Sequence, residues 1–238
     1  MKGVILAAGT GTRLKPLTRK LPKPLVSLLG RPLIDYTIEA FAQAGFTELG
    51  VVVGYKDHLL RRYLSDGTRY GIRIQYLPNI HYLRGNATSI LASKSFVQNE
   101  PFVVSMADHI ISTAILKRLL VCARSGHTLC VDRQAHDLTH ISDATKVWVD
   151  KRGFVVHIGK ELVRFNAIDT GVFLFTPRIF RYIPISQNDG LNSITRAIRL
   201  MIIRGDHLGT CDVSGTFWFD VDTPDDLRYA RTALCSQA

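Results

Sequence analysis

The sequence lacks any apolar run close to the roughly 18 residues that a membrane-spanning helix needs. The apolar start at 3–8 is too short for an export signal and runs directly into glycines, so we expect a cytoplasmic protein without a membrane part. Cysteine is scarce, with four residues and no C-x-x-C pair, which argues for reduced, mostly buried thiols rather than a disulfide scaffold or a zinc site.

Two common phosphate-binding loops are also absent. A dinucleotide fingerprint needs a third glycine opening into a helix, but here that position is Leu14 and prolines follow. The G-x-x-x-x-G-K-[S/T] loop of the P-loop proteins does not occur. These absences exclude the two best-known classes of nucleotide-binding α/β protein.

Negative charge is in short supply, because 30 lysines and arginines face 20 acidic residues and give a formal net charge of +10. Such an excess attracts polyanions, and nucleic acid is one candidate. The basic residues are scattered, however, with no basic arm and no recognisable nucleic-acid module. We therefore expect small phosphorylated substrates and no nucleic-acid partner.

Short apolar runs alternate with amphipathic segments in the first half of the chain. The expected strands are 3–8, 49–53, 73–77, 102–106 and 128–131, and the expected helices are 33–44, 57–64, 88–97 and 113–124. This alternation predicts an α/β fold with a mixed, mostly parallel sheet flanked by helices on both faces.

The second half has a different pattern. Segments 145–149 and 154–158 flank a turn and predict a hairpin, and 169–175 and 216–221 read as further strands. Apolar spacing predicts a helix at 191–204, and T-P-D-D at 223–226 is a good start for a last helix ending near 234. No linker or repeat interrupts the chain, so we predict a single domain over 1–238, with a nucleotide half up to about Asp108.

The strongest motif follows the first expected strand. It reads G-x-G-T-R-L-x-P-L-T from Gly9 to Thr18, with P-K-P-L at 22–25. Glycines let backbone N–H groups approach a phosphate chain closely. Arg13 can hold phosphate oxygens in a bidentate manner, and Lys23 adds a mobile positive charge.

This motif resembles the signature of the sugar-1-phosphate nucleotidyltransferases and their cytidylyltransferase relatives. Further matching pieces occur in the same order along the chain: S-M-A-D-H at 105–109, G-K-E-L at 159–162, D-T-G-V-F at 169–173 and W-F-D-V-D-T at 218–223. The D-H pair and W-x-D-V-D-T-P-x-D-L are most similar to CTP:inositol-1-phosphate cytidylyltransferases, which are often fused to a membrane domain. This chain ends at Ala238 without one, so it resembles the stand-alone form.

The resemblance implies a Rossmann-like nucleotidyltransferase fold, a three-layer sandwich of GT-A type, and a defined set of site residues. The implied nucleotide-binding residues are Leu6, Ala7, Ala8, Gly9, Gly11, Thr12, Arg13, Lys23, Asn79, Gly85, Asn86 and Asp108. Arg13, Lys23 and Lys160 are the implied catalytic cations. The implied acceptor-binding residues are Lys160, Asp169, Thr170 and Gly171.

A Mg²⁺ cofactor held by Asp108 and Asp220 is also implied. Both carboxylates end expected strands, where oxygen ligands for a hard cation can meet. Asp222 competes with Asp220 for the role of second ligand, and the sequence leaves that choice open. Asn86 has two readings, since it can contact a pyrimidine edge or cap the next helix. We expect His109, beside Asp108, to have a packing or supporting role.

The expected activity is transfer of a cytidylyl group from CTP to inositol 1-phosphate, giving CDP-inositol and pyrophosphate. The nucleophile would be a phosphate that is mostly dianionic near neutrality, so the site has to neutralise charge and align the groups. Alternatives within the class are a sugar-1-phosphate enzyme using UTP or dTTP and a phosphocholine enzyme. A non-catalytic nucleotide sensor is disfavoured because the signature residues are retained. The sequence leaves the base, the acceptor and the choice between monomer and homodimer open.

Overall fold

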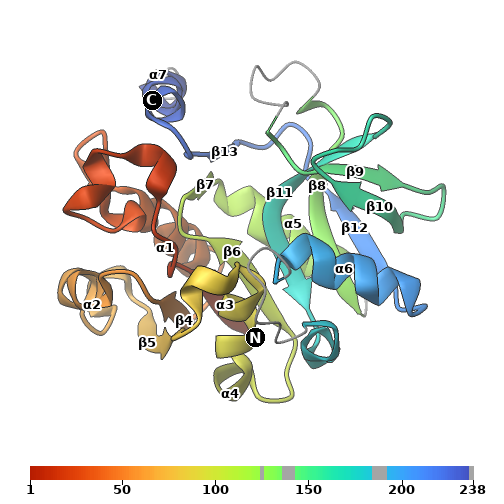
Figure 1. Cartoon of the computed structure of the whole chain (residues 1–238), viewed down its shortest axis with the longest axis horizontal. Coiled ribbons are helices and arrows are strands. Elements are labelled where there is room, and N and C mark those ends of the chain that lie inside the picture. The colour runs from red at the N-terminus through yellow and green to blue at the C-terminus, as the bar shows by residue number, and fades with distance from the viewer. Residues whose placement is uncertain (124–125, 136–142, 184–191, 236–238) are drawn as a thin grey trace.

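The computed structural model describes residues 1–123, 126–135, 143–183 and 192–235. A mixed sheet lies between helices (Figure 1), as the alternation of apolar runs predicted. Within the described residues nine strands form this sheet, with the path β10-β9-β11-β6-β1-β4-β5 and with β8 joining β11 to β12. Their bounds are β1 Lys2–Leu6, β4 Glu48–Val53, β5 Arg73–Pro78, β6 Phe102–Met106, β8 His127–Asp132, β9 Lys146–Val149, β10 Val155–Gly159, β11 Ala167–Phe175 and β12 Leu208–Asp212.

The first half of the chain supplies the parallel part of the sheet. Strand β1 pairs in parallel with both β4 and β6, and β4 pairs in parallel with β5. The second half adds antiparallel pairs, because β11 runs antiparallel to β6, β8 and β9. Strand β11 therefore joins the two halves of the sheet through its pairing with β6, which in turn pairs with β1.

Helices cover both faces of the sheet, which gives three layers. On one face lie α1 Leu33–Gln43, α2 Asp57–Leu64 and α5 Thr113–Cys122. On the other lie α3 Ala87–Ala92, α4 Lys94–Val97 and α6 Ile194–Ile203. Strand β1 shows why: its alternate side chains Val4 and Leu6 join one buried cluster, and Ile5 joins the other. No described helix has both the length and the apolar character that crossing a bilayer requires.

The C-terminal segment returns to the first half of the molecule. Strand β13, Trp218–Asp220, pairs antiparallel with β7, His109–Ile111, outside the main sheet. Helix α7, Pro224–Cys235, then packs near a short hairpin formed by β2 Ser27–Leu28 and β3 Arg31–Pro32 (Figure 1). This return brings residues from the two ends of the chain to one place.

Several elements differ from the sequence predictions. The helix expected at 88–97 is divided at Ser93, whose hydroxyl donates to the carbonyl of Ile90 at 2.6 Å and competes with the helical pattern. Strands β7 and β12 were not predicted, because their polar residues interrupt the apolar pattern. The helix expected at 191–204 is α6, whose start at Ser193 is capped by the serine hydroxyl; position 191 lies outside the described residues, as does position 124 at the end of the helix expected at 113–124.

Candidate active site

Two adjoining cavities lie where β1 and β6 end. Their volumes are about 720 and about 230 Å³. Both are lined by residues of the glycine motif and by aspartates from distant segments; the shared ones are Leu6, Gly9, Arg13, Asp108 and Asp222. Most of the residues that the sequence singled out on separate motifs line one of these two cavities, which we together call the recess, and Asn79 and Thr170 line neither.

The glycine loop packs closely against the P-K-P-L segment. Gly11 has φ +63°, and a Cβ at this position would lie 2.7 Å from the Cβ of Lys23. A side chain at residue 11 is therefore excluded both by its backbone conformation and by its neighbour. The hydroxyl of Thr18 donates to the carbonyl oxygen of Gly11 at 2.8 Å. These contacts fix the loop beside Lys23, while Gly9, Gly11 and Thr12 line the smaller cavity.

Lys23 lies at the centre of a buried cluster of charges. Its ammonium contacts Asp108 Oδ2 at 2.5 Å and Asp222 Oδ1 at 2.6 Å, and its side chain is only 9% exposed. Burial alone would lower the pKa of Lys23, but Asp108 and the neighbouring carboxylates raise it above the ordinary lysine value. The same ammonium lowers the pKa of Asp108 and of Asp222 against the opposing effect of burial. All three groups are therefore charged at neutral pH.

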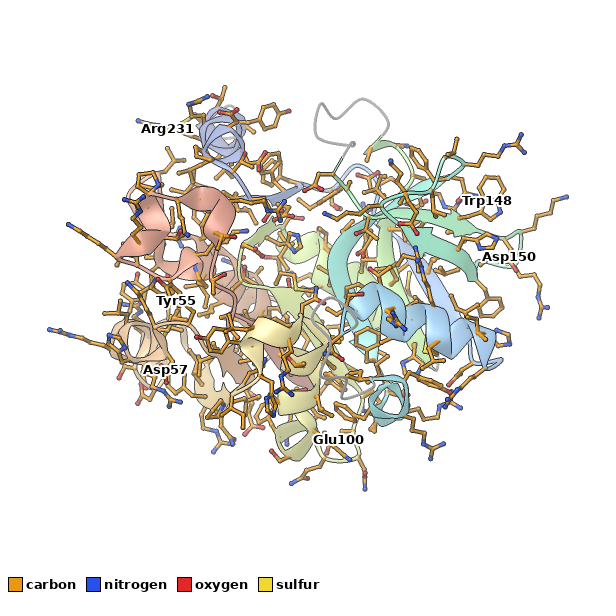
Figure 2. All side chains as sticks on the ribbon, in the orientation of Figure 1. Tyr55, Asp57, Glu100, Trp148, Asp150 and Arg231 are labelled. Carbon is orange, nitrogen blue, oxygen red and sulfur yellow. The ribbon has the colours of Figure 1, made fainter. Side chains whose placement is uncertain are left out.

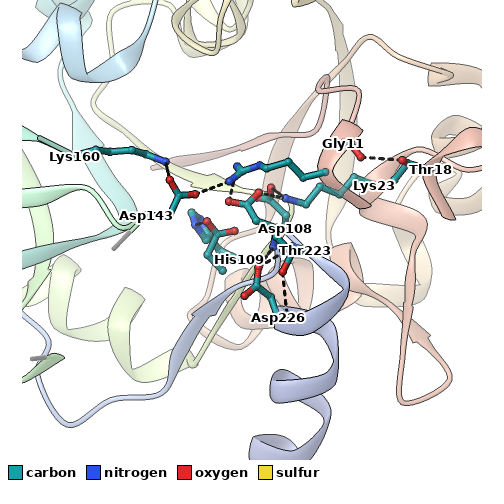
Figure 3. A network of polar contacts seen from close by, with 12 residues as sticks. Gly11, Thr18, Lys23, Asp108, His109, Asp143, Lys160, Thr223 and Asp226 are labelled. Atoms are coloured by element: carbon teal, nitrogen blue, oxygen red, sulfur yellow. Dashed lines mark hydrogen bonds and ion pairs between the residues drawn. The ribbon is translucent and has the colours of Figure 1, made fainter. Parts of the chain in front are cut away.

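A chain of ion pairs continues from this cluster across the cavity (Figure 3). Arg13 contacts Asp222 Oδ2 at 2.6 Å and Asp143 Oδ2 at 2.5 Å. Lys160 contacts the other oxygen of Asp143 at 2.8 Å. Three cations, Lys23, Arg13 and Lys160, thus lie in a row that joins the glycine-motif side to the hairpin of β9 and β10.

His109 and Asp220 meet through the pairing of β7 with β13. The two residues are register partners, and His109 Nε2 lies 3.4 Å from Asp220 Oδ2. Burial lowers the pKa of His109, but the Asp220 carboxylate raises it more, to a net value of about 9. The ring also lies against Gly171, whose φ is +74° and where a Cβ would lie 2.3 Å from the imidazole. His109 therefore fills the space between the aspartate and β11.

The carboxylates of Asp108 and Asp220 offer the oxygen ligands that a hard divalent cation prefers. Ligand atoms of Asp108, His109 and Asp220 all lie within 4.8 Å of one another. Among the described residues Asp220 Oδ1 is buried without a hydrogen-bond partner, and burial raises the pKa of this carboxyl. An unpaired buried carboxylate oxygen is costly unless a cation accompanies it. By contrast, both oxygens of Asp222 contact basic side chains, which favours Asp220 as the site of a metal contact.

The predicted acceptor residues lie on β11. Asp169 lines the larger cavity, and its Oδ1 accepts a hydrogen bond from the backbone N–H of Gly171 at 2.7 Å. Burial raises the pKa of Asp169 to about 6. Thr170 points the other way, since it is fully buried and its hydroxyl donates to the carbonyl of Cys130 at 2.9 Å. Asp169 and Gly171 thus face the cavity, whereas the Thr170 side chain serves the packing between β11 and β8.

Only part of the predicted base-binding region lines the larger cavity. Gly85 and Asn86 line the larger cavity. The side chain of Asn86 does not cap α3; its Oδ1 accepts from the backbone N–H of Ile194, at the start of α6, at 2.9 Å. Asn79 is buried, and its amide nitrogen donates to the hydroxyls of Thr88 and Ser89. Asn79 therefore holds the loop and α3 together instead of facing the recess.

Sequence reasoning missed Asp143 altogether. It follows no recognised motif, and one of its two partners, Arg13, is 130 residues away in the chain. A weak signal exists: an acidic residue just before β9 lies opposite Lys160 just after β10, because residues 146 and 159 pair across this hairpin. Trp148 lies at the outer edge of this hairpin (Figure 2) and is 39% exposed.

Comparison with known proteins identifies the family. A family model described as nucleotidyl transferase matches residues 2–137. This chain belongs to the nucleotidyl transferase family. The fold agrees with this assignment, because this chain superimposes on the inositol-1-phosphate CTP transferase from T. maritima with a TM-score of 0.85. The two sequences are 27% identical, and the superposition covers 99% of this chain and 94% of the other.

Sequence relatives point in the same direction. Proteins named bifunctional IPC transferase and DIPP synthase are 32% identical over 99% of this chain in Aquifex aeolicus and 35% identical over 98% in Rubrobacter xylanophilus. The chain spans about half the length of these relatives, 52% of each. A glucose-1-phosphate thymidylyltransferase of Streptomyces antibioticus is 32% identical over 98% of this chain and 66% of its own length. Each of these names includes a transferase activity.

Proposed function

We propose that this chain transfers a cytidylyl group from CTP to inositol 1-phosphate and releases pyrophosphate. The observation that carries the proposal is the row of Lys23, Arg13 and Lys160 along one recess, beside an acidic cluster. Such an arrangement suits two polyanions that must meet. The choice of inositol 1-phosphate and CTP rests on the similarity to the inositol-1-phosphate CTP transferase from T. maritima and to the IPC transferases.

In the proposed mechanism the chain supplies charge and alignment. Arg13, together with the backbone of the loop from Gly9 to Gly11, binds the β- and γ-phosphates of the nucleotide. Lys23 stabilises the α-phosphate, and Lys160 binds the phosphate of the acceptor. An oxygen of that phosphate attacks the α-phosphorus, and the bond to the leaving pyrophosphate breaks. No general base is required, because the attacking phosphate is mostly dianionic near pH 7.

Asp108 and Asp220 are the proposed ligands of Mg²⁺, and Lys23 and His109 hold these carboxylates in place. When bound, the cation would neutralise charge on the phosphates. We expect Asp108→Ala to lower turnover at least 10²- to 10³-fold. The variant should also lose Mn²⁺ binding in calorimetry and keep the wild-type circular dichroism spectrum. Asp222→Asn is the matched comparison: if it abolished Mn²⁺ binding while Asp220→Asn did not, the assignment of the second ligand would be reversed.

The remaining roles are assigned by position. Gly85 and Asn86 are proposed to face the base and ribose, and Asp169 and Gly171 to face hydroxyls of the polyol. We further propose that residues 1–238 act as one domain, because β11 pairs with β6 and the residues of α7 share a buried cluster with the first half. In this proposal the protein works in the cytoplasm as a monomer or homodimer.

The decisive experiment measures pyrophosphate release with CTP, UTP, dTTP and ATP, each paired with inositol 1-phosphate and with glucose 1-phosphate, with and without Mg²⁺. We expect CTP with inositol 1-phosphate to be the best pair by at least tenfold in kcat/KM, and EDTA to stop the reaction. Turnover only with glucose 1-phosphate and a uridine or thymidine nucleotide would refute the inositol assignment.

A sugar-1-phosphate nucleotidyltransferase is the second candidate. It is favoured by the 32% identity to the glucose-1-phosphate thymidylyltransferase of Streptomyces antibioticus, which covers 98% of this chain. The same cations and acidic cluster would serve that reaction, because both acceptors present a phosphate monoester. The two candidates differ in the base and in the hydroxyls of the acceptor, and the substrate panel above separates them.

A further inference from the structure

Asp143 occupies an unexpected place among the cations of the recess (Figure 3). It lies just before β9, and its two carboxylate oxygens contact different cations: Oδ2 contacts Arg13 at 2.5 Å and Oδ1 contacts Lys160 at 2.8 Å. Under the proposed function these cations bind the phosphates of the nucleotide and of the acceptor. A carboxylate of the protein thus bridges two groups that the substrates need.

The fold holds Asp143 at this point. Strands β9 and β10 are antiparallel, and Lys146 lies opposite Gly159. Asp143, before β9, and Lys160, after β10, therefore lie at the same end of the hairpin. The ammonium of Lys146 also donates to the carbonyl oxygen of Lys160 at 3.1 Å, which ties the two segments together. The contact with Arg13 then crosses from this hairpin to the loop after β1.

The exposure of these groups allows exchange. The side chains of Arg13, Asp143 and Lys160 are 51%, 59% and 53% exposed, whereas Lys23 is 9% exposed. Exposed ion pairs contribute little free energy and exchange readily with solvent ions. The hydrogen bond from Lys160 lowers the pKa of Asp143, so its carboxylate is charged and competes with anions at neutral pH.

We propose that Asp143 is an affinity-setting residue: its carboxylate stands in for phosphate between Arg13 and Lys160 and must be displaced when the phosphorylated substrates bind. A phosphate group and the Asp143 carboxylate need the same N–H donors of these two side chains. Each substrate therefore binds more weakly than it would to free cations. Pyrophosphate, as a product that needs Arg13, also leaves more easily.

This inference rests on the proposed function for its biological meaning, but its test does not require turnover. The experiment measures the binding of inorganic pyrophosphate and of inorganic phosphate to the full chain by isothermal titration calorimetry at low salt. We expect Asp143→Asn to bind both probes about three- to tenfold more tightly than wild type, the range that loss of two exposed ion pairs allows. The gain should shrink as salt is raised.

Two further variants make the result specific. Asp143→Glu keeps the charge and should bind the probes as wild type does. Asp57→Asn is the matched control, because Asp57 forms an ion pair with Arg61 on α2, at the rim of the molecule (Figure 2), and it should leave the affinity unchanged. Asp143→Asn should also lower the KM for both substrates in any active pair.

If the folded Asp143→Asn variant bound the anions as wild type does, or more weakly, the proposal would be overturned. Asp143 would then serve only to connect the two segments of the structure. A gain shown equally by Asp143→Glu would overturn it too, since charge would then not be the cause. Thermal unfolding of each variant establishes that the folded protein is being compared. Failure of the proposed function would show instead as tight anion binding without turnover of any nucleotide and acceptor pair.

Discussion

The two sides of the recess hold positive charge in different ways. On the glycine-motif side, Lys23 is buried and contacts two carboxylates. On the hairpin side, Lys160 is 53% exposed and contacts one carboxylate. A buried charge is tolerated only when it is paired and well placed, so the Lys23 cluster is also part of the core. An exposed pair contributes little to folding, so the hairpin side is free to exchange its partner for a ligand.

Replacing Lys23 with methionine should have the largest effect on stability. The change removes the cation that lies between the Asp108 and Asp222 carboxylates and leaves Asp222 with Arg13 alone, and we expect a loss of about 3–5 kcal/mol in the free energy of unfolding at pH 8. Lys23 holds the pKa of both carboxyls below the ordinary value of 3.8, so its contribution is present above that value and is lost as pH falls.

Urea denaturation between pH 8 and pH 3 measures this effect. The difference between wild type and the Lys23→Met variant should narrow as pH falls below the ordinary carboxyl value of 3.8, because the carboxyls then become protonated and no longer need the ammonium. If the Lys23→Met variant lost less than about 1 kcal/mol in the free energy of unfolding at pH 8, Lys23 would contribute no more to stability than an exposed ion pair does. The two sides of the recess would then not differ in their contribution to folding.

Asp169 provides an intermediate case, since it is a cavity-lining carboxyl that forms no ion pair with a lysine or arginine among the described residues. Burial raises its pKa from 3.8 to about 6, so ionisation above pH 6 disfavours the folded state, and the penalty is absent below the ordinary pKa. We expect Asp169→Asn to stabilise the protein by about 1–3 kcal/mol at pH 8 and to have almost no effect at pH 3, below the ordinary pKa. Denaturant unfolding at both pH values tests this, and equal stabilisation at both would show that the charge is not responsible.

Replacing Lys160 with methionine should have the smallest effect on stability. We expect a change of less than about 1 kcal/mol in the free energy of unfolding, because the side chain is half exposed. The KM for the phosphorylated acceptor should nevertheless rise about tenfold, the equivalent of one lost charged contact of about 1.4 kcal/mol. Steady-state kinetics and thermal unfolding separate the two effects. Lys151→Met, in the turn of the same hairpin, is the control, and it should change neither quantity.

Much of this molecule could be predicted from the sequence. The apolar runs of β1, β4, β6 and β11 correspond to strands of the sheet, because buried strands need continuous apolar residues. The glycine motif predicted an anion-binding loop, because glycines let backbone N–H groups approach a phosphate closely. In the structure this loop lies beside Lys23, with Gly11 at φ +63°. Strand β7 was missed, since three residues of mixed polarity leave no periodic pattern.

The sequence by itself predicted which residues carry the proposed chemistry: the two glycines, the cations at 13, 23 and 160, and the aspartates at 108, 220 and 222. Only the tertiary structure decided which of these residues contact one another. Strand β13 returns across the molecule and brings Asp222 to Lys23, 199 residues away, while leaving Asp220 beside His109. Asp143 reaches Arg13 across 130 residues. Such partnerships are set by strand order and by the return of the chain end, and local sequence patterns carry no information about contacts over that separation.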